Sequence, residues 1–190
     1  VLVLTFTRDA AGELRRRLRR FDLRAPIEAG TFHSVALRLL RDRALARNEP
    51  APTVATDRLR LVREAVTELR LGIDPAAAMA ELDWARARLV APAAYADAVR
   101  AERRRSTLAP ERFADLHERY QDVKRSRRVV DFDDLLERCL VAMQQDPTFA
   151  DAVRWRFRHF FVDEAQDLNP LQFRLLEAWR DGRPDLCLVG

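Results

Sequence analysis

The stretch from Phe160 to Pro170, FFVDEAQDLNP, joins an apolar run to a group of acidic and amide side chains. Residues 160–162 predict a strand that is buried in a sheet, because the run is short, continuous and rich in aromatic and β-branched residues. Asn169 and Pro170 have the residue types of a helix N-cap and a first helical position, so a helix should follow. This order of strand, acidic turn and helix predicts an α/β fold, and it raises the question of what the carboxylates hold.

The start of the chain has the same order of elements. Residues 1–6, VLVLTF, are an apolar run typical of a parallel strand, and Thr7 has the residue type of an N-cap for the helix after it. Residues 27–31 predict a second extended segment, which is followed by an amphipathic helix from Phe32. In open parallel sheets, ligands bind beyond the carboxyl ends of the strands. The segments expected at that edge are Thr5–Thr7, Thr31–Ser34 and Asp163–Asp167.

The middle of the chain has a different pattern. Between residues 46 and 128, apolar residues recur at helical spacing in runs that proline and glycine separate. We therefore expect an α/β domain, residues 1–45 and 129–190, whose parallel sheet is interrupted by an all-helical insertion.

Composition limits the classes of function. With 190 residues, of which 48% are hydrophobic and 34% charged, the chain is typical of a soluble globular protein, and it has no apolar run of the roughly 20 residues that a membrane helix needs. The net charge of +4 permits a nucleic-acid partner without establishing one, because the basic residues are arginines apart from Lys124. Cys139 and Cys187 lie far apart in apolar segments, so both are expected to be buried thiols rather than a disulfide or a metal pair.

The acidic turn has the residue types of a nucleotide site. A carboxylate held rigidly behind a buried strand, as Asp163 would be, suits a Mg²⁺ ion that bridges nucleotide phosphates. The adjacent Glu164 can orient and deprotonate water, and Gln166 can donate to or accept from a terminal phosphate. The structural alternative is that these acids only favour the dipole of the helix that follows.

Several motifs together resemble the superfamily 1 DNA helicases of the UvrD, Rep and PcrA type. VDEAQDLNPLQ is similar to their motif II, whose form of the Walker B box is Asp-Glu-x-Gln-Asp. VLVLTFTRDAAGEL resembles motif Ia, GTFHSVALRLLR resembles motif Ib, and the final LCLVG stands where motif III would begin. The resemblance covers essentially the whole chain. It implies a partial RecA-like P-loop NTPase sheet, domain 1A, with a helical insertion like subdomain 1B.

The resemblance implies a role for each residue of the acidic turn. Asp163 would bind Mg²⁺, Glu164 would be the catalytic base for ATP hydrolysis, and Gln166 would couple the γ-phosphate to DNA. Asp167 would complete the motif in a structural or coupling role. ATP and Mg²⁺ would be the cofactors, and the protein would act in the bacterial cytoplasm at the nucleoid, with 3′ to 5′ polarity.

Single-stranded DNA, and its junction with a duplex, would be the partner that the resemblance implies. Phe6 would stack on a base, because every base offers a π-face, although at a strand end it could also belong to the core. Phe32 begins the apolar stripe of its helix and is the residue most expected to be structural. His33 could be either a structural residue or a DNA contact. The residues that would meet the DNA are Thr5, Phe6, Thr7, Thr31, Phe32, His33 and Ser34.

A P-loop, Gly-x-x-x-x-Gly-Lys-Ser/Thr, does not occur in the 190 residues, since the five glycines lack this spacing and Lys124 has no glycine beside it. We therefore expect the chain to be a piece of a longer helicase, whose P-loop strand would lie beside the motif II strand and whose second motor domain would follow. The piece alone is then expected to hydrolyse no ATP.

Two other functions stay open. The chain could be a non-catalytic nucleic-acid-binding module that has kept the helicase fold without its P-loop. It could also be a metal-dependent nuclease that uses Asp163, Glu164 and Asp167, although no lysine lies near this cluster in the sequence.

Other charged groups are expected to have structural roles. Asp131, Asp133 and Asp134 should cap and orient the helix that they precede or begin. The arginine clusters at residues 15–17 and 103–105 should be solvated faces, although the second could touch duplex DNA in the way that the resemblance to subdomain 1B implies.

Overall fold

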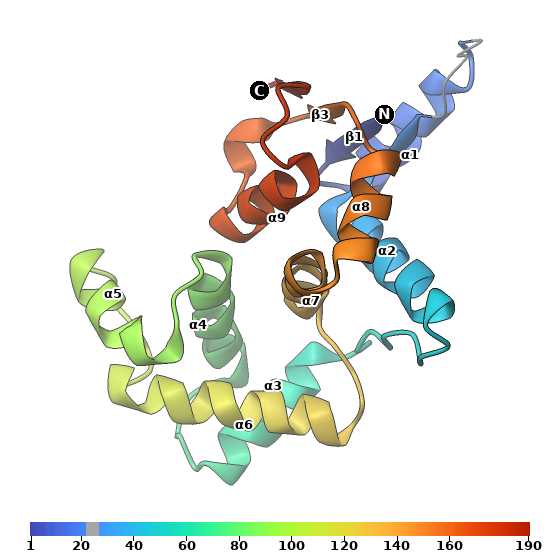
Figure 1. Cartoon of the computed structure of the whole chain (residues 1–190). Helices are drawn as coiled ribbons and strands as arrows, with labels where there is room; N and C mark the ends of the chain where they lie inside the picture. The colour runs from blue at the N-terminus through green and yellow to red at the C-terminus, as the bar shows by residue number, and fades with distance from the viewer. Residues whose placement is uncertain (22–26) are drawn as a thin grey trace. The chain divides into compact units, whose positions relative to one another are not determined.

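The computed structural model describes residues 1–21 and 27–190. The chain divides into two compact units, Val1–Pro52 with Phe132–Gly190, and Thr53–Asp131. Figure 1 shows the strands in the first unit and the helices α3 to α6 of the second. No helix in the described ranges is long and apolar enough to span a membrane.

A four-stranded parallel sheet forms the centre of the first unit. Its strands are β1 (Leu2–Thr5), β2 (Glu28–Thr31), β3 (Phe160–Val162) and β4 (Leu186–Leu188). They lie in the order β2-β1-β3-β4, and each neighbouring pair is parallel. The predicted α/β class with a parallel sheet is therefore confirmed.

Helices surround this sheet. The helices of the first unit are α1 (Arg8–Leu18), α2 (Phe32–Ala46), α7 (Phe132–Gln145), α8 (Pro147–Arg156) and α9 (Pro170–Arg180). One face of the sheet carries Leu2, Leu4 and Val162, which are fully buried. Glu28 belongs to the same face and pairs with Arg38 of α2 and with Arg156 of α8, so these two helices lie on that side.

The opposite face is less covered toward β4. Ala29, Val3, Phe161 and Cys187 form one row across it, and α1 packs against β2 and β1 at the Ala29 end. Ala29 is 4% exposed, whereas Phe161 is 44% exposed and the Cys187 thiol is exposed. The expectation of two buried cysteines is right for Cys139, whose pKa burial raises to about 12, and wrong for Cys187, because β4 is an edge strand.

The strand order also corrects the expected place of a P-loop strand. β3 pairs with β1 on one side and with β4 on the other, so neither of its backbone edges is free. The expectation of a further strand directly beside β3 is therefore wrong. Within the described sheet, the free edges belong to β2 and β4.

Gly30 lets α2 begin directly above the sheet. A Cβ atom on Gly30 would lie 2.8 Å from Ser34 Oγ and 3.2 Å from Val35 Cγ2. The Ser34 hydroxyl accepts a hydrogen bond from the Thr31 backbone N–H at 2.9 Å, so it is not free to move away. The close approach of strand and helix thus requires a residue without a side chain.

We expect Gly30→Ala to lower the free energy of unfolding by about 1–3 kcal/mol, because the added methyl overpacks this contact. Gly12, in the interior of α1, has open space around its Cα. Gly12→Ala should therefore raise the free energy of unfolding by about 0.5–1 kcal/mol. Urea denaturation of both variants checks this, and effects of the same sign would contradict the packing at Gly30.

The second unit is a helical unit with an aromatic core. Its helices are α3 (Arg58–Glu68), α4 (Pro75–Ala87), α5 (Tyr95–Ala101) and α6 (Phe113–Ser126), with the 3-10 turns η1 (Pro92–Ala94) and η2 (Pro110–Arg112). Tyr95 and Phe113 stack with ring centroids 3.7 Å apart, and both are fully buried.

The first and last segments of the second unit are hydrogen-bonded to each other. Val54 and Val130 form a parallel bridge. The Ala55 N–H donates to Val130 O at 2.8 Å, and the Val130 N–H donates to Thr53 O at 2.9 Å. The unit therefore begins and ends at one place.

The carboxylate of Asp131 lies at the centre of a buried polar cluster in this unit. Arg86 Nη1 donates to both of its oxygens, at 3.0 and 2.8 Å. Tyr120 Oη donates to Oδ2 at 2.7 Å, and Lys124 Nζ at 2.9 Å. Burial and the Asp131 charge raise the pKa of Tyr120, which keeps its hydroxyl a donor. Residues 133 and 134 lie in the first turn of α7, as expected, but the sequence did not predict this cluster.

We expect Asp131→Asn to lower the free energy of unfolding of the second unit by about 3–5 kcal/mol, because it leaves two buried cations without their shared anion. Asp115→Asn is the matched control, since Asp115 is 54% exposed and pairs with Arg112 on the surface. Its effect should stay within about 1 kcal/mol. Equal losses in thermal unfolding of the two variants would contradict the importance of the buried cluster.

The arginine cluster 103–105 is only partly a solvated face. Arg103 and Arg105 are exposed, as expected. Arg104 instead pairs with the buried Glu81, and its guanidinium lies over the Trp84 ring, 4.8 Å from the centroid. Arg104 therefore packs against the second unit rather than projecting freely into solvent.

Candidate functional site

The three segments predicted at the carboxyl edge of the sheet leave it side by side. Thr5, Thr31 and Val162 are the last residues of β1, β2 and β3, and these strands are adjacent and parallel. Asp163–Asp167 follows β3 directly, and the Asp163 N–H donates to Leu4 O at 2.9 Å. The structure thus brings the acidic turn next to the end of β1.

The acidic turn is built by an unusual backbone conformation. Glu164 has φ 53° and ψ 45°, in the left-handed region, and precedes the 3-10 turn η3 (Ala165–Asp167). Because the chain turns here, the neighbouring carboxylates of Asp163 and Glu164 need not point to opposite faces as they would along a strand. Asp163 is partly buried, and the side chain of Glu164 is exposed.

Gln166, within the acidic turn, lies close to Gly190 just beyond β4. Its Nε2 donates to Glu164 Oε2 at 2.5 Å. The Ala165 N–H donates to Val189 O at 2.8 Å, and a Cβ on Gly190 would lie only 2.1 Å from Gln166 Oε1. Gly190 therefore leaves the room that the Gln166 side chain occupies, and no sequence pattern predicts this contact.

The donor set fits a Mg²⁺ ion that phosphates help to hold. No side chain in residues 1–21 or 27–190 donates a hydrogen bond to the Asp163 carboxylate or forms an ion pair with it. Such an acceptor suits one ligand position of Mg²⁺, which usually combines one or two carboxylates with water and substrate phosphates. In the same ranges, no group of three or more His, Cys, Asp or Glu side chains could hold a metal.

The two phenylalanines predicted to meet DNA differ in accessibility. Phe32 is 1% exposed, and its ring stacks on Trp179 with centroids 6.1 Å apart. Because the 1% applies to the whole residue, Phe32 belongs to the core. Phe6 is partly buried, with its ring 6.3 Å from that of Phe32, and keeps an accessible part of its surface.

The hydroxyl residues at this edge fix the starts of the two helices. Thr31 and Ser34 form a capping box, in which the Ser34 N–H donates to Thr31 Oγ1 at 3.2 Å and the Thr31 N–H donates to Ser34 Oγ. Thr7 caps α1 by accepting from the Ala10 N–H at 3.1 Å. Thr5 is 2% and Thr31 8% exposed, whereas Thr7 and Ser34 lie on the surface. The capping hydrogen bonds therefore hold the exposed Thr7 and Ser34 at this edge of the sheet.

His33 completes the set of predicted residues. It is partly buried, and its ring lies edge-on to that of Phe132 at 5.7 Å. This contact connects the first turn of α2 with the first turn of α7, so His33 has a structural contact in addition to any role at the surface.

The left-handed backbone of Glu164 predicts how glycine at this position would change the free energy of unfolding. A Cβ atom in this region costs roughly 1 kcal/mol, and glycine avoids this cost at the expense of a more flexible unfolded chain. We expect Glu164→Gly to leave the free energy of unfolding unchanged or to raise it by less than about 1 kcal/mol, as measured by urea denaturation.

Arg174→Gly is the control for this substitution. Arg174 is exposed in the interior of α9, where glycine should lower the free energy of unfolding by about 1 kcal/mol. A loss at residue 164 as large as the loss at residue 174 would show that the Glu164 backbone is not strained.

The fold and the acidic turn define the class of protein. A parallel sheet that carries an acidic turn behind an inner strand, with a helical unit inserted between β2 and β3 in the chain, is a partial RecA-like α/β domain. The sequence matches the UvrD/REP helicase N-terminal domain family over residues 1–190. The chain belongs to this family.

Curated relatives cover the whole chain. "ATP-dependent DNA helicase UvrD2" of Mycobacterium tuberculosis is 37% identical over 206 residues, which are 100% of this chain and 29% of the relative. "ATP-dependent DNA helicase UvrD1" of the same species is 30% identical, and "ATP-dependent DNA helicase PcrA" of Leuconostoc citreum is 29% identical; each alignment covers 100% of this chain and 26% of the relative. The chain thus spans less than a third of the length of these relatives.

Proposed function

We propose that this chain is part of an ATP-dependent DNA helicase or translocase that moves 3′ to 5′ along single-stranded DNA. The observation that carries the proposal is the turn Asp163–Asp167, whose Asp163 N–H donates to Leu4 O of the neighbouring strand and whose Asp163 carboxylate has no partner among the described side chains. The names of the relatives, which are ATP-dependent DNA helicases, support it further.

The acidic turn would act on the nucleotide. Asp163 provides a ligand for Mg²⁺, and the bound ion would neutralise charge on the phosphates of ATP. Glu164, exposed one residue further on, accepts the proton of the attacking water. Gln166 contacts Glu164 and the end of β4, which suits a residue that reports the state of the γ-phosphate to the rest of the edge. Asp167 keeps a structural or coupling role.

The neighbouring strand ends would form part of the DNA track. The accessible surface of Phe6 offers a stacking partner for a base, and Thr7 offers its hydroxyl to the sugar-phosphate backbone. Ser34 is exposed at the same edge, and its hydroxyl donates to Thr31 O. Thr5, Thr31 and Phe32 are buried and would support this edge from the interior, and the partly buried His33 follows Phe32 in the first turn of α2. Single-stranded DNA and its junction with a duplex are the proposed partners.

The domain assignment follows the same proposal. Residues 1–45 and 129–190 belong to domain 1A, and residues 46–128 form a 1B-like insertion. The division into two compact units at residues 53 and 131 supports this arrangement. The site of action is the bacterial cytoplasm at the nucleoid.

The P-loop and the second motor domain would come from the remainder of the longer protein. The free edge of β4 is the proposed neighbour of the P-loop strand, since both edges of β3 are paired. Leu188 and Val189 are 49% and 53% exposed, so this edge has apolar surface that a further strand and its helix would cover.

Glu164→Gln in the longer protein tests the proposed chemistry. We expect the substitution to lower the kcat of DNA-stimulated ATP hydrolysis by about 10²–10⁴-fold, because it removes the general base. The KM for ATP should change little, since Glu164 acts on water rather than on binding. Steady-state hydrolysis with and without single-stranded DNA measures both quantities.

Glu118→Gln, an exposed substitution in α6, is the control and should leave turnover unchanged. The 190-residue chain alone should hydrolyse no ATP. ATP turnover by that chain, if Glu164→Gln abolishes it, would overturn the proposal that the P-loop comes from the remainder of the longer protein. DNA binding by the longer protein without any ATP turnover would instead identify a binding module.

A further inference from the structure

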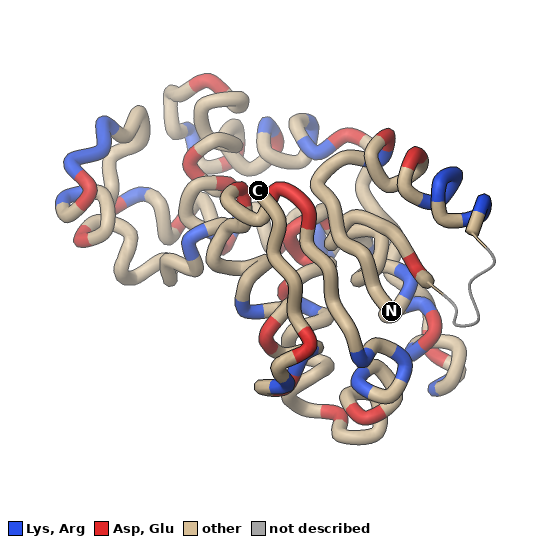
Figure 2. The backbone as a smooth tube through the Cα atoms, turned by 90° about the horizontal axis from the view of Figure 1, so that it is seen from above, with Lys and Arg blue, Asp and Glu red and all other residues tan. Residues whose placement is uncertain are grey.

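The positive charge of the chain is concentrated in one segment. Residues 8–21 contain six arginines and two acids, Asp9 and Glu13, which gives the segment a net charge of +4. The whole chain has 34 basic and 30 acidic residues, so 28 of each remain outside the segment. The net positive charge of the protein therefore equals that of α1 and the turn that follows it. Figure 2 shows the run of basic residues in the last turns of α1.

Most of these arginines have no carboxylate partner among the residues that the structure describes. All six are exposed. Arg16 and Arg17 share Glu13, whereas Arg19 and Arg20 form no ion pair with any residue in the ranges 1–21 and 27–190. Their charge is thus available to a ligand.

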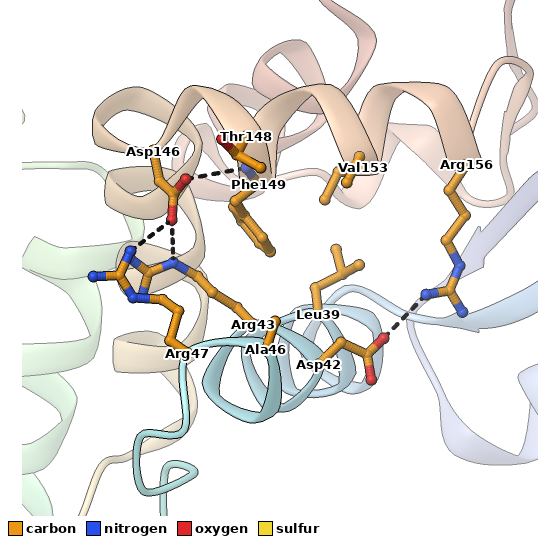
Figure 3. A pocket seen from close by; sticks show the side chains of 11 residues that line it. Leu39, Asp42, Arg43, Ala46, Arg47, Asp146, Thr148, Phe149, Val153 and Arg156 are labelled. Atoms are coloured by element: carbon orange, nitrogen blue, oxygen red, sulfur yellow. Dashed lines mark hydrogen bonds and ion pairs between the residues drawn. The ribbon is translucent and has the colours of Figure 1, made fainter.

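The groove between α2 and α8 shows the opposite arrangement. In Figure 3, Arg43 and Arg47 share Asp146 at one end of a cavity of about 450 Å³, and Arg156 pairs with Asp42 at the other end. The arginines there are neutralised within the protein. Exposed arginines alone therefore do not make an anion site, and residues 8–21 are distinguished by their net charge of +4.

Three of the arginines are close together at the end of α1. Arg16 lies in the last turn of α1, Arg19 is its C-cap, and Arg20 lies in the turn that follows, where its N–H donates to Arg17 O at 3.0 Å. Like charges close together repel each other, and favourable interaction with the helix dipole requires no such cluster. A polyanion bound to this cluster would relieve the repulsion.

The cluster lies away from the candidate site. From Thr7, its N-cap, to Arg19, its C-cap, α1 rises about 18 Å, at about 1.5 Å per residue. This length corresponds to roughly five base pairs, at about 3.4 Å per phosphate of one strand. The two surfaces would therefore contact different parts of one nucleic acid.

We propose that Arg16, Arg19 and Arg20 form a second surface for the phosphodiester backbone of nucleic acid, separate from the edge at Thr5–Thr7. The inference rests on the proposed function in that DNA is the polyanion that the longer protein meets. Phe21, 64% exposed directly after the cluster, offers a stacking surface if the bound region is single-stranded.

Salt-dependent binding by the longer protein tests the surface. Binding of a labelled single strand and of a blunt duplex is measured between about 50 and 200 mM salt. In the variant Arg16→Gln/Arg19→Gln/Arg20→Gln, the slope of log K against log salt should become shallower by about 2 to 3, as three phosphate contacts predict. The DNA that shows this change identifies the duplex or the single strand as the ligand.

Arg41→Gln/Arg138→Gln/Arg174→Gln is the charge-matched control. These three arginines are exposed and form no ion pair with a described residue, so the net charge falls equally. The control should keep the slope of the unchanged protein. An equal change of the slope in both triple variants would overturn the proposal, because it would show only the effect of net charge. No change of the slope in either variant would also overturn it, because the arginines would then only be solvated.

Arg16→Lys/Arg19→Lys/Arg20→Lys should restore the slope, since a lysine contacts phosphate as a point charge. Failure of the lysine variant to restore the slope, when the glutamine variant has lost it, would indicate a structural role and overturn the proposal. If the unchanged protein binds no DNA, the proposed function fails as well. If it binds DNA and only the comparison of variants fails, this inference alone is lost.

Discussion

The parallel pairing of β1 with β3 is the contact on which the rest of the first unit depends. It joins residues 2–4 to residues 160–162, and β2 and β4 are added on its two sides. The acidic turn and the Thr5–Thr7 segment are neighbours only because these two strands are. A contact so distant in sequence is opposed by loop-closure entropy, and the helices that bury Leu2, Leu4 and Val162 must offset it.

The sequence is sufficient where a local pattern specifies the structure. The apolar runs 1–6 and 160–162 form inner strands, and Asn169 with Pro170 begins α9 as their residue types predict. The order of strands is not local. Which strand lies beside β3 depends on pairing between distant segments, so neither the place of β4 nor the exposure of Cys187 followed from the sequence pattern.

The candidate site shows the same division. Topology alone predicted that the three segments would meet at one edge. The conformation of Glu164, the stacking of Phe32 on Trp179 and the burial of Lys124 against Asp131 depend on contacts between elements, and no periodicity specifies them. Phe32 illustrates the difficulty, since one residue satisfies both an apolar helical stripe and a motif that the resemblance assigns to DNA.

The bridge between Val54 and Val130 has a consequence for how such proteins diversify. Because the helical unit begins and ends at hydrogen-bonded neighbours, its two ends are as close together as the ends of a short loop. Each doubling of a flexible loop adds only about 0.6 kcal/mol of closure free energy, so the length between these two residues is nearly irrelevant to the sheet. Evolution can therefore enlarge, shorten or replace the helices between residues 54 and 130 while the machinery at the carboxyl edge of the strands stays as it is.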